Sequence, residues 1–266
     1  MSDPQKPVED ELAGTEQPFV AHLVELRDRL IRMLLAIGAA AAALALYPGP
    51  GRLYDLLAAP LIATLPEGAH LIATSVISPF MVPLKILLMA SFLIALPVVL
   101  YQLWAFVAPG LYSHEKKLVL PLVISSTVLF FIGVAFSYFF VFGQVFKFIQ
   151  GFAPKSITAA PDIEAYLTFV LTMFFAFGLA FEVPIAVVVL ARLGVVSVQK
   201  LKDFRGYFWV LAFIIAAIVT PPDVVSQLAL AIPMCVLYEV GIWASRLFIK
   251  HTKAPDAEAE AGTEPS

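Results

Sequence analysis

Six apolar runs, separated by short polar or proline-rich segments, dominate the chain. The fifth run holds only some 15 residues, or about 22 Å of helix, whereas about 20 residues are needed to cross a bilayer. That helix therefore requires a thinned bilayer or shielding by its neighbours. The pattern predicts an all-α integral membrane protein with six transmembrane helices, at about residues 30–47, 84–107, 118–142, 166–191, 206–220 and 224–249.

Composition points to the same class. Apolar residues make up 61% of the 266 positions and charged residues only 14%, and the mean hydropathy is +0.90, unlike a soluble globular chain. A single cysteine, Cys235, excludes a disulfide within the chain. The four histidines are scattered over loops and tails, so we predict no metal site. Phosphate-cradling and nucleic-acid-binding patterns are absent as well, so we predict no other cofactor and no nucleic-acid partner.

Lysine and arginine gather on one side of the predicted membrane. Thirteen of the 17 lie on the side of both termini, which the positive-inside rule assigns to the cytoplasm. We therefore expect a multi-pass protein of the cytoplasmic (inner) membrane: a polar N-terminal tail (1–17), one six-span domain (18–250) and an acidic, disordered C-terminal tail (251–266), both tails cytoplasmic. A cleaved signal peptide over residues 27–47 is disfavoured, because its basic region follows a polar, acidic leader.

One carboxylate, Glu182, lies deep in the fourth apolar run. At about 1.5 Å per residue it is roughly 15 Å from Arg192 and roughly 24 Å from Tyr166, near the bilayer midplane. Such residues usually face a bundle interior or a wet cavity. Two readings remain open: a protonated side chain bonded to a neighbouring helix, or a functional group.

The segment before the first span is amphipathic. Apolar side chains recur there at helical spacing, while His22, Glu25, Arg29 and Arg32 fall on a second face. We expect a helix along the cytoplasmic interface that runs into the first span. From the pattern alone, Glu25 and Arg29 are best read as an ordinary intrahelical pair worth about 0.3–0.5 kcal/mol.

Five motifs occur in a fixed order along the chain. They are HLVELRDRL (22–30), IATSVISPF (72–80), LYQLWAFVAPGLYSHEKK (100–117), AFGLAFEVP (176–184) and TPPDVVSQ (220–227). Together they resemble the TatC family, the receptor subunits of the twin-arginine protein translocase. The resemblance covers about Gln17 to Lys250, and five signatures at the expected intervals make it specific.

The resemblance implies six spans in a concave, glove-like bundle, with spans five and six short and both termini cytoplasmic. It also implies a receptor without enzymatic activity, which binds signal peptides bearing paired arginines on folded cargo. The expected partners are the single-span subunits TatA and TatB, further copies of the chain and the lipid bilayer, and the expected energy source is the proton motive force.

The resemblance places the signal-binding site on the cytoplasmic side. Glu115 would contact the arginine pair, while Phe106 and Glu25 would line the same site together with His22 and Arg29. Arginine is planar, permanently charged and bidentate toward carboxylates, so acidic side chains suit this task. The competing interpretation of Glu115 is a surface ion pair with Lys116 or Lys117, worth about 0–1 kcal/mol.

The remaining carried-over residues lie in the spans and on the outer side. Glu182 and Gln227 are predicted to meet partner helices, and Asp223 to shape the turn between the last two spans. Pro97 is assigned a structural role in the second span. On the outer side we expect an interfacial helix over 51–65, broken at Pro60, and a loop over 143–165, which together cap the concave face.

Rival functions leave fewer traces in the sequence. A proton-coupled secondary transporter would also use Glu182, but such folds usually show internal repeats and more buried polar sites. An intramembrane serine protease needs a nucleophile and a base at depth, whereas Ser113 and His114 lie in a loop. The transporter is therefore kept as the alternative, and the protease is rejected.

Overall fold

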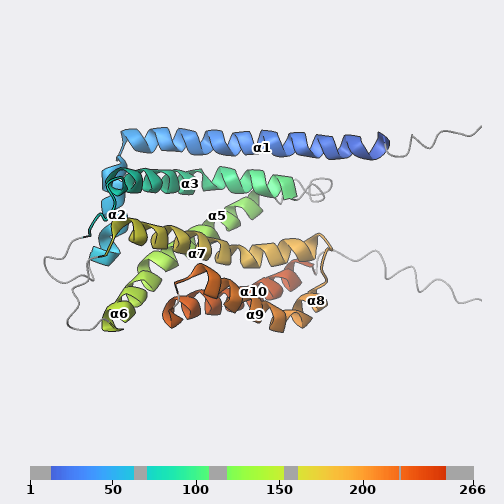
Figure 1. The fold of residues 1–266 in the computed structure, drawn as a ribbon. Helices are drawn as coiled ribbons and strands as arrows, with labels where there is room; N and C mark the ends of the chain where they lie inside the picture. Colours follow the sequence, from blue (N-terminus) through green and yellow to red (C-terminus); the bar gives the residue numbers. More distant parts are fainter. Residues whose placement is uncertain (1–12, 63–70, 108–118, 153–160, 222, 250–266) are drawn as a thin grey trace, which may run out of the picture.

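The computed structural model describes residues 13–62, 71–107, 119–152, 161–221 and 223–249. Nearly all of them are helical (Figure 1). Five of these helices are long and apolar enough to cross a membrane, and a sixth apolar helix is shorter. The all-α, six-span membrane fold is thus confirmed. The elements are α1 (Ala13–Leu46), α2 (Pro50–Ile62), α3 (Ser78–Val107), α5 (Val119–Phe136), η2 (Ser137–Val141), α6 (Phe142–Phe152), α7 (Ile163–Arg192), α8 (Val198–Asp203), α9 (Arg205–Val219) and α10 (Val224–Ile249).

The helices cross the molecule roughly side by side, and α2 lies across one end of α3 (Figure 1). Helix α7 is central, packing against α5, α10 and α3. Its Val170, Met173 and Phe177 are completely buried. Helix α1 packs mainly against α3, and none of its apolar span is buried inside the protein. Much of α1 is therefore available to lipid or to a partner helix.

Two close approaches seat α7 against α5. A Cβ atom built on Gly133 would lie 2.5 Å from the carbonyl oxygen of Phe177, and one on Gly178 would lie 2.4 Å from Cζ of Phe130. At Gly133 the obstacle is backbone, so only glycine permits that approach, whereas a Cβ at Gly178 would require the buried Phe130 ring to shift. The α5–α7 contact is therefore fixed from both sides.

The predicted helix before the first span runs directly into that span. Helix α1 is unbroken from Ala13 to Leu46, and its position relative to the membrane interface stays a prediction. The segment from His22 to Ile37 holds neither proline nor glycine, hence nothing bends the helix there. The polar face of residues 22–32 is consequently a continuation of span one.

Three predictions about the helices need correction. Helical structure continues beyond Gly143 through α6 to Phe152, so the predicted outer loop over 143–165 is partly helix. Helix α2 runs without interruption to Ile62, so it is not broken at position 60. Helix α10 has 26 residues, enough for about 39 Å, so the expectation of a short sixth span is wrong, and among the described spans only the fifth is short.

A cluster of polar side chains joins the N-terminal ends of α3 and α7. Asp162 caps α7 by accepting the backbone N–H groups of Glu164 and Ala165, both at 2.9 Å, and its second oxygen accepts the Thr74 hydroxyl at 2.7 Å. The Thr74 hydrogen bond is the main reason that the pKa of Asp162 falls to about 2. Lys85 donates to Glu164 at 2.6 Å.

Two tyrosines attach α2 to the long helices. The hydroxyl of Tyr138 donates to the carbonyl of Leu56, and that of Tyr166 donates to the carbonyl of Leu57, each at 2.7 Å. The carbonyl of Leu56 has no helical partner four residues on, because Pro60 lacks an N–H group. This end of the molecule is therefore held by side-chain contacts between segments far apart in sequence.

Candidate functional site

Four of the five residues predicted to bind a signal peptide fall within the described segments, and they lie along the contact between α1 and α3. His22, Glu25 and Arg29 are three and four residues apart, which places them on one helical face. The His22 ring stacks on the Phe106 ring of α3, with centroids 4.4 Å apart and an interplanar angle of 17°. The fifth residue, Glu115, lies outside the described residues.

The centre of this surface is a carboxylate that already holds a guanidinium. Arg29 donates to Glu25 Oε1 from Nε at 2.9 Å and also from Nη2. Its third nitrogen, Nη1, donates to the side-chain oxygen of Gln102 on α3 at 3.3 Å. Arg29 thereby connects α1 to α3.

Exposure distinguishes the two partners. The Glu25 side chain keeps 45% of its exposure and that of Arg29 only 16%. The second oxygen of Glu25 lies 4.0 Å from His22 Nδ1, and no other described group is recorded as its partner. A carboxylate oxygen is therefore accessible beside an aromatic stack, and we call His22, Glu25, Arg29, Gln102 and Phe106 the α1–α3 site.

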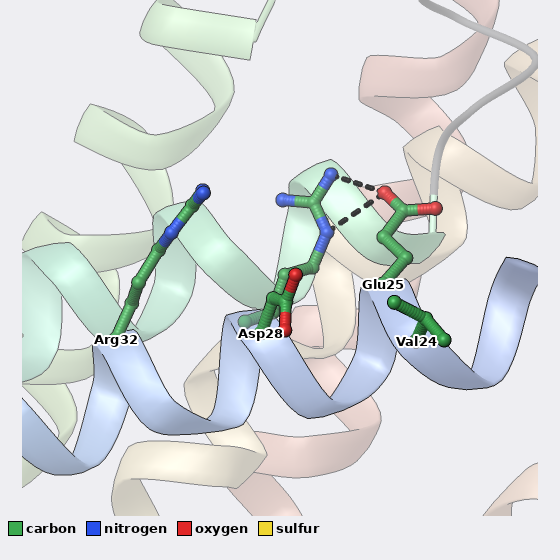
Figure 2. Close-up of a pocket in the computed structure, with 5 residues that line it drawn as sticks. Val24, Glu25, Asp28 and Arg32 are labelled. Atoms are coloured by element: carbon green, nitrogen blue, oxygen red, sulfur yellow. Dashed lines mark hydrogen bonds and ion pairs between the residues drawn. The ribbon is translucent and has the colours of Figure 1, made fainter.

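A shallow hollow of roughly 370 Å³ opens beside this site on α1. Figure 2 shows that Glu25 and Arg32 extend from the same side of the helix, with Val24 and Asp28 nearby. Asp28 is engaged by its neighbour Arg27, whose Nη2 lies 2.8 Å from Oδ1. Glu25 is thus the acid of this hollow whose carboxylate pairs with Arg29, the arginine that reaches α3.

Gln102 was not among the predicted site residues. It is buried, with 6% of its surface exposed, although glutamine is usually exposed. The only signal in the sequence is an amide within an otherwise apolar helix, and that signal does not name Arg29 as its partner. The pairing becomes visible only once α1 and α3 are placed side by side.

Glu182 lies in a second, separate polar position. Both carboxylate oxygens are buried and have no hydrogen-bond partner. The Ser126 hydroxyl of α5 lies close to this carboxyl. Ser126 accepts the indole N–H of Trp104 from α3 at 2.9 Å. Side chains of α3, α5 and α7 therefore come together at this polar position inside the bundle.

Polar side chains of the last two spans have identified contacts. Gln227 donates to the carbonyl of Phe213 at 3.4 Å and lines an open apolar groove between α9 and α10. Asp223 accepts the backbone N–H of Ser226 at 2.7 Å and so caps α10. Glu239 pairs with Arg205 of α9 at 2.7 Å. Pro97 lies within α3, which remains helical through it, and Pro60 lies within α2.

Comparison with known proteins points to one family. The family model described as "Sec-independent protein translocase protein (TatC)" matches residues 21–233. The chain is 46% identical over 233 residues to the TatC protein of Escherichia coli strain K12, covering 88% of this chain and 90% of that protein. It is 52% identical over 243 residues to the TatC protein of Halothiobacillus neapolitanus, covering 91% of this chain and 66% of that protein.

A solved structure has the same fold. A crystal structure titled as the twin-arginine translocase receptor TatC superposes with a TM-score of 0.73 at 42% sequence identity. The match covers 85% of this chain and 98% of that chain. At this identity the likeness extends beyond general helical architecture to the order and packing of the spans.

Proposed function

Because this chain belongs to the TatC family of Sec-independent protein translocase proteins, we propose that its α1–α3 site binds the paired arginines of export signal peptides. The protein is a multi-pass component of the inner membrane, and it is a translocase subunit rather than an enzyme. The similar crystal structure is described as a receptor of the twin-arginine translocase. A proton-coupled transporter finds no support among these relatives.

The observation that carries the proposal is the contact between Arg29 and Glu25. It shows that the α1–α3 site accommodates a guanidinium against a carboxylate, beside the His22–Phe106 stack. An arginine from a signal peptide has the same donors and can also lie over an aromatic ring. Glu25 Oε2 is the accessible acceptor, and Glu115 supplies the second carboxylate of the proposed site.

Arg29 has a definite part in this proposal. It neutralises Glu25 before the signal arrives, so an incoming guanidinium competes with it for the same carboxylate. Gln102 holds Arg29 through Nη1 and remains available as its partner during the exchange. A lysine offers one compact ammonium instead of a planar fork and competes less well.

Site-specific photocrosslinking tests where the signal binds. A photoreactive phenylalanine analogue at Phe106 is expected to crosslink to a twin-arginine signal peptide near its arginines, because Phe106 packs on His22 at the centre of the site. The same analogue at Trp209, on the exposed face of α9, serves as the control. Equal crosslinking at the two positions would contradict the proposed location.

The wider assembly follows from the family. We propose that TatA and TatB bind this subunit in the membrane, that further copies join the receptor complex, and that both termini face the cytoplasm. The exposed span of α1 and the groove beside Gln227 are the described surfaces available to single-span helices. The proton motive force is the proposed energy source for moving folded cargo.

Glu182 is proposed as the intramembrane contact for a partner helix. Its carboxyl has no hydrogen-bond partner, and a buried polar group gains on the order of 1 kcal/mol from a bond across helices. Glu182→Ala is expected to reduce disulfide crosslinking of α7 to TatA or TatB while leaving signal-peptide binding within about twofold. The matched control is Thr172→Ala, because Thr172 is another polar residue of the same helix. Wild-type crosslinking to both partners would count against this role.

A further inference from the structure

A second charged hollow lies between α9 and α10, at the end of the molecule where α9 begins and α10 ends. It measures roughly 340 Å³. Helix α9 contributes its first residue, Arg205, and α10 contributes Arg246 from its last turn. The complete lining is Arg205, Glu239, Val240, Ile242, Trp243 and Arg246. None of these residues belongs to the α1–α3 site.

The charges of this hollow do not balance. The hollow holds two guanidinium groups and one carboxylate. Arg205 Nη2 pairs with Glu239 Oε2 at 2.7 Å. Arg205 Nε is buried and has no hydrogen-bond partner. A buried donor without an acceptor costs free energy, but the Arg205 side chain as a whole is 43% exposed, so other parts of this guanidinium can reach a bound anion. Arg246, on the same wall, is exposed and supplies further donors.

The hollow continues onto an apolar surface. Trp243 is 63% exposed and Val240 is 46% exposed, and both lie on a helix long and apolar enough to cross the membrane. Tryptophan is typical of the headgroup region of a membrane, because its ring is largely apolar and carries one polar N–H group. A bound molecule would therefore meet two arginines at one end and hydrocarbon-facing side chains along the rest.

From this combination we propose that the α9–α10 hollow binds an anionic phospholipid, with its phosphodiester between Arg205 and Arg246 and an acyl chain along Val240 and Trp243. Basic pockets between membrane helices suit anionic headgroups. Glu239 fixes the position of Arg205 and lowers the formal charge of the hollow to about +1, which one phosphodiester neutralises. A free phosphate would use the two arginines but not the apolar wall, so the lipid makes the more extensive contact.

Native mass spectrometry of the purified protein with added lipid tests the proposal. Phosphatidylglycerol is expected to remain bound where phosphatidylcholine does not. Arg246→Gln should weaken phosphatidylglycerol binding about fivefold, and Arg246→Gln combined with Arg205→Gln about 25-fold, if each arginine contributes as a membrane-surface cation usually does. Arg52→Gln, on α2 at the opposite end of the molecule, should leave lipid binding unchanged.

Two controls keep the result interpretable. Arg246→Gln leaves the Arg205–Glu239 pair intact, so its thermal unfolding should match wild type, and lipid loss in this variant cannot be attributed to misfolding. Millimolar inorganic phosphate should not displace the lipid. Undiminished phosphatidylglycerol binding in both arginine variants, or displacement by free phosphate, would overturn the proposal. Signal-peptide binding by Arg246→Gln reports separately on the α1–α3 site.

Discussion

Replacing Glu25 or Glu115 with glutamine is expected to weaken binding of a twin-arginine signal peptide about 10- to 150-fold for each substitution. Glutamine keeps the size of the side chain but removes the negative charge, and a hydrogen bond to a charged group contributes about 1.5–3 kcal/mol. Isothermal titration or fluorescence anisotropy with the purified protein in detergent measures the dissociation constant. The double variant should show no measurable binding.

The matched control for this prediction is Asp28→Asn. Asp28 lies in the same hollow as Glu25, but its carboxylate is occupied by Arg27 at 2.8 Å. Its replacement removes the same charge from the same helix, and it should change peptide affinity less than about threefold because surface pairs contribute little. An equal loss in Asp28→Asn and Glu25→Gln would reduce the effect to general electrostatics and remove Glu25 as a specific contact.

Adding one methyl group at Gly133 is expected to destabilise the protein by about 1–3 kcal/mol or more, as overpacking of a membrane or soluble core typically does. The new Cβ would lie 2.5 Å from the carbonyl oxygen of Phe177. That oxygen belongs to the backbone of α7, so the clash is relieved only by separating α5 from α7. Gly133→Ala should lower the temperature of thermal unfolding in detergent and reduce the yield of folded protein.

Gly143→Ala is the control for this substitution. A Cβ atom at Gly143 meets nothing within 4 Å, and alanine is favoured over glycine in a helix by up to about 1 kcal/mol. The variant should therefore be as stable as wild type or slightly more stable. A Gly133→Ala protein as stable as Gly143→Ala would show that α5 and α7 are not closely packed at this point.

The apolar runs were sufficient to predict the number of spans, because about 20 apolar residues specify a crossing without reference to any partner. Boundaries near proline and glycine were predicted less well. Pro79 lies in the first turn of α3, where a residue needs no backbone N–H for helical hydrogen bonding. Gly143 does not end the helix, because the residues on both sides of it are helical. Such residues end or permit helices according to context.

The site shows the same division. Helical spacing placed His22, Glu25 and Arg29 on one face, and the family motif added Phe106, whose ring the structure stacks on His22. The contacts of Gln102 with Arg29, Asp162 with Thr74 and Arg205 with Glu239 were not predicted. Each joins separate helices or segments, and the first two join positions more than 70 residues apart, so pairing follows from tertiary packing and not from local periodicity.

The most direct test of the central claim compares one signal peptide with its lysine twin. The purified protein is titrated with a peptide carrying the paired arginines and with the same peptide carrying two lysines, at the same ionic strength. We predict that the arginine peptide binds at least about tenfold more tightly, because only guanidinium is planar and bidentate toward carboxylate. Equal affinities would contradict the account, since a site that only measures positive charge cannot be a receptor for paired arginines.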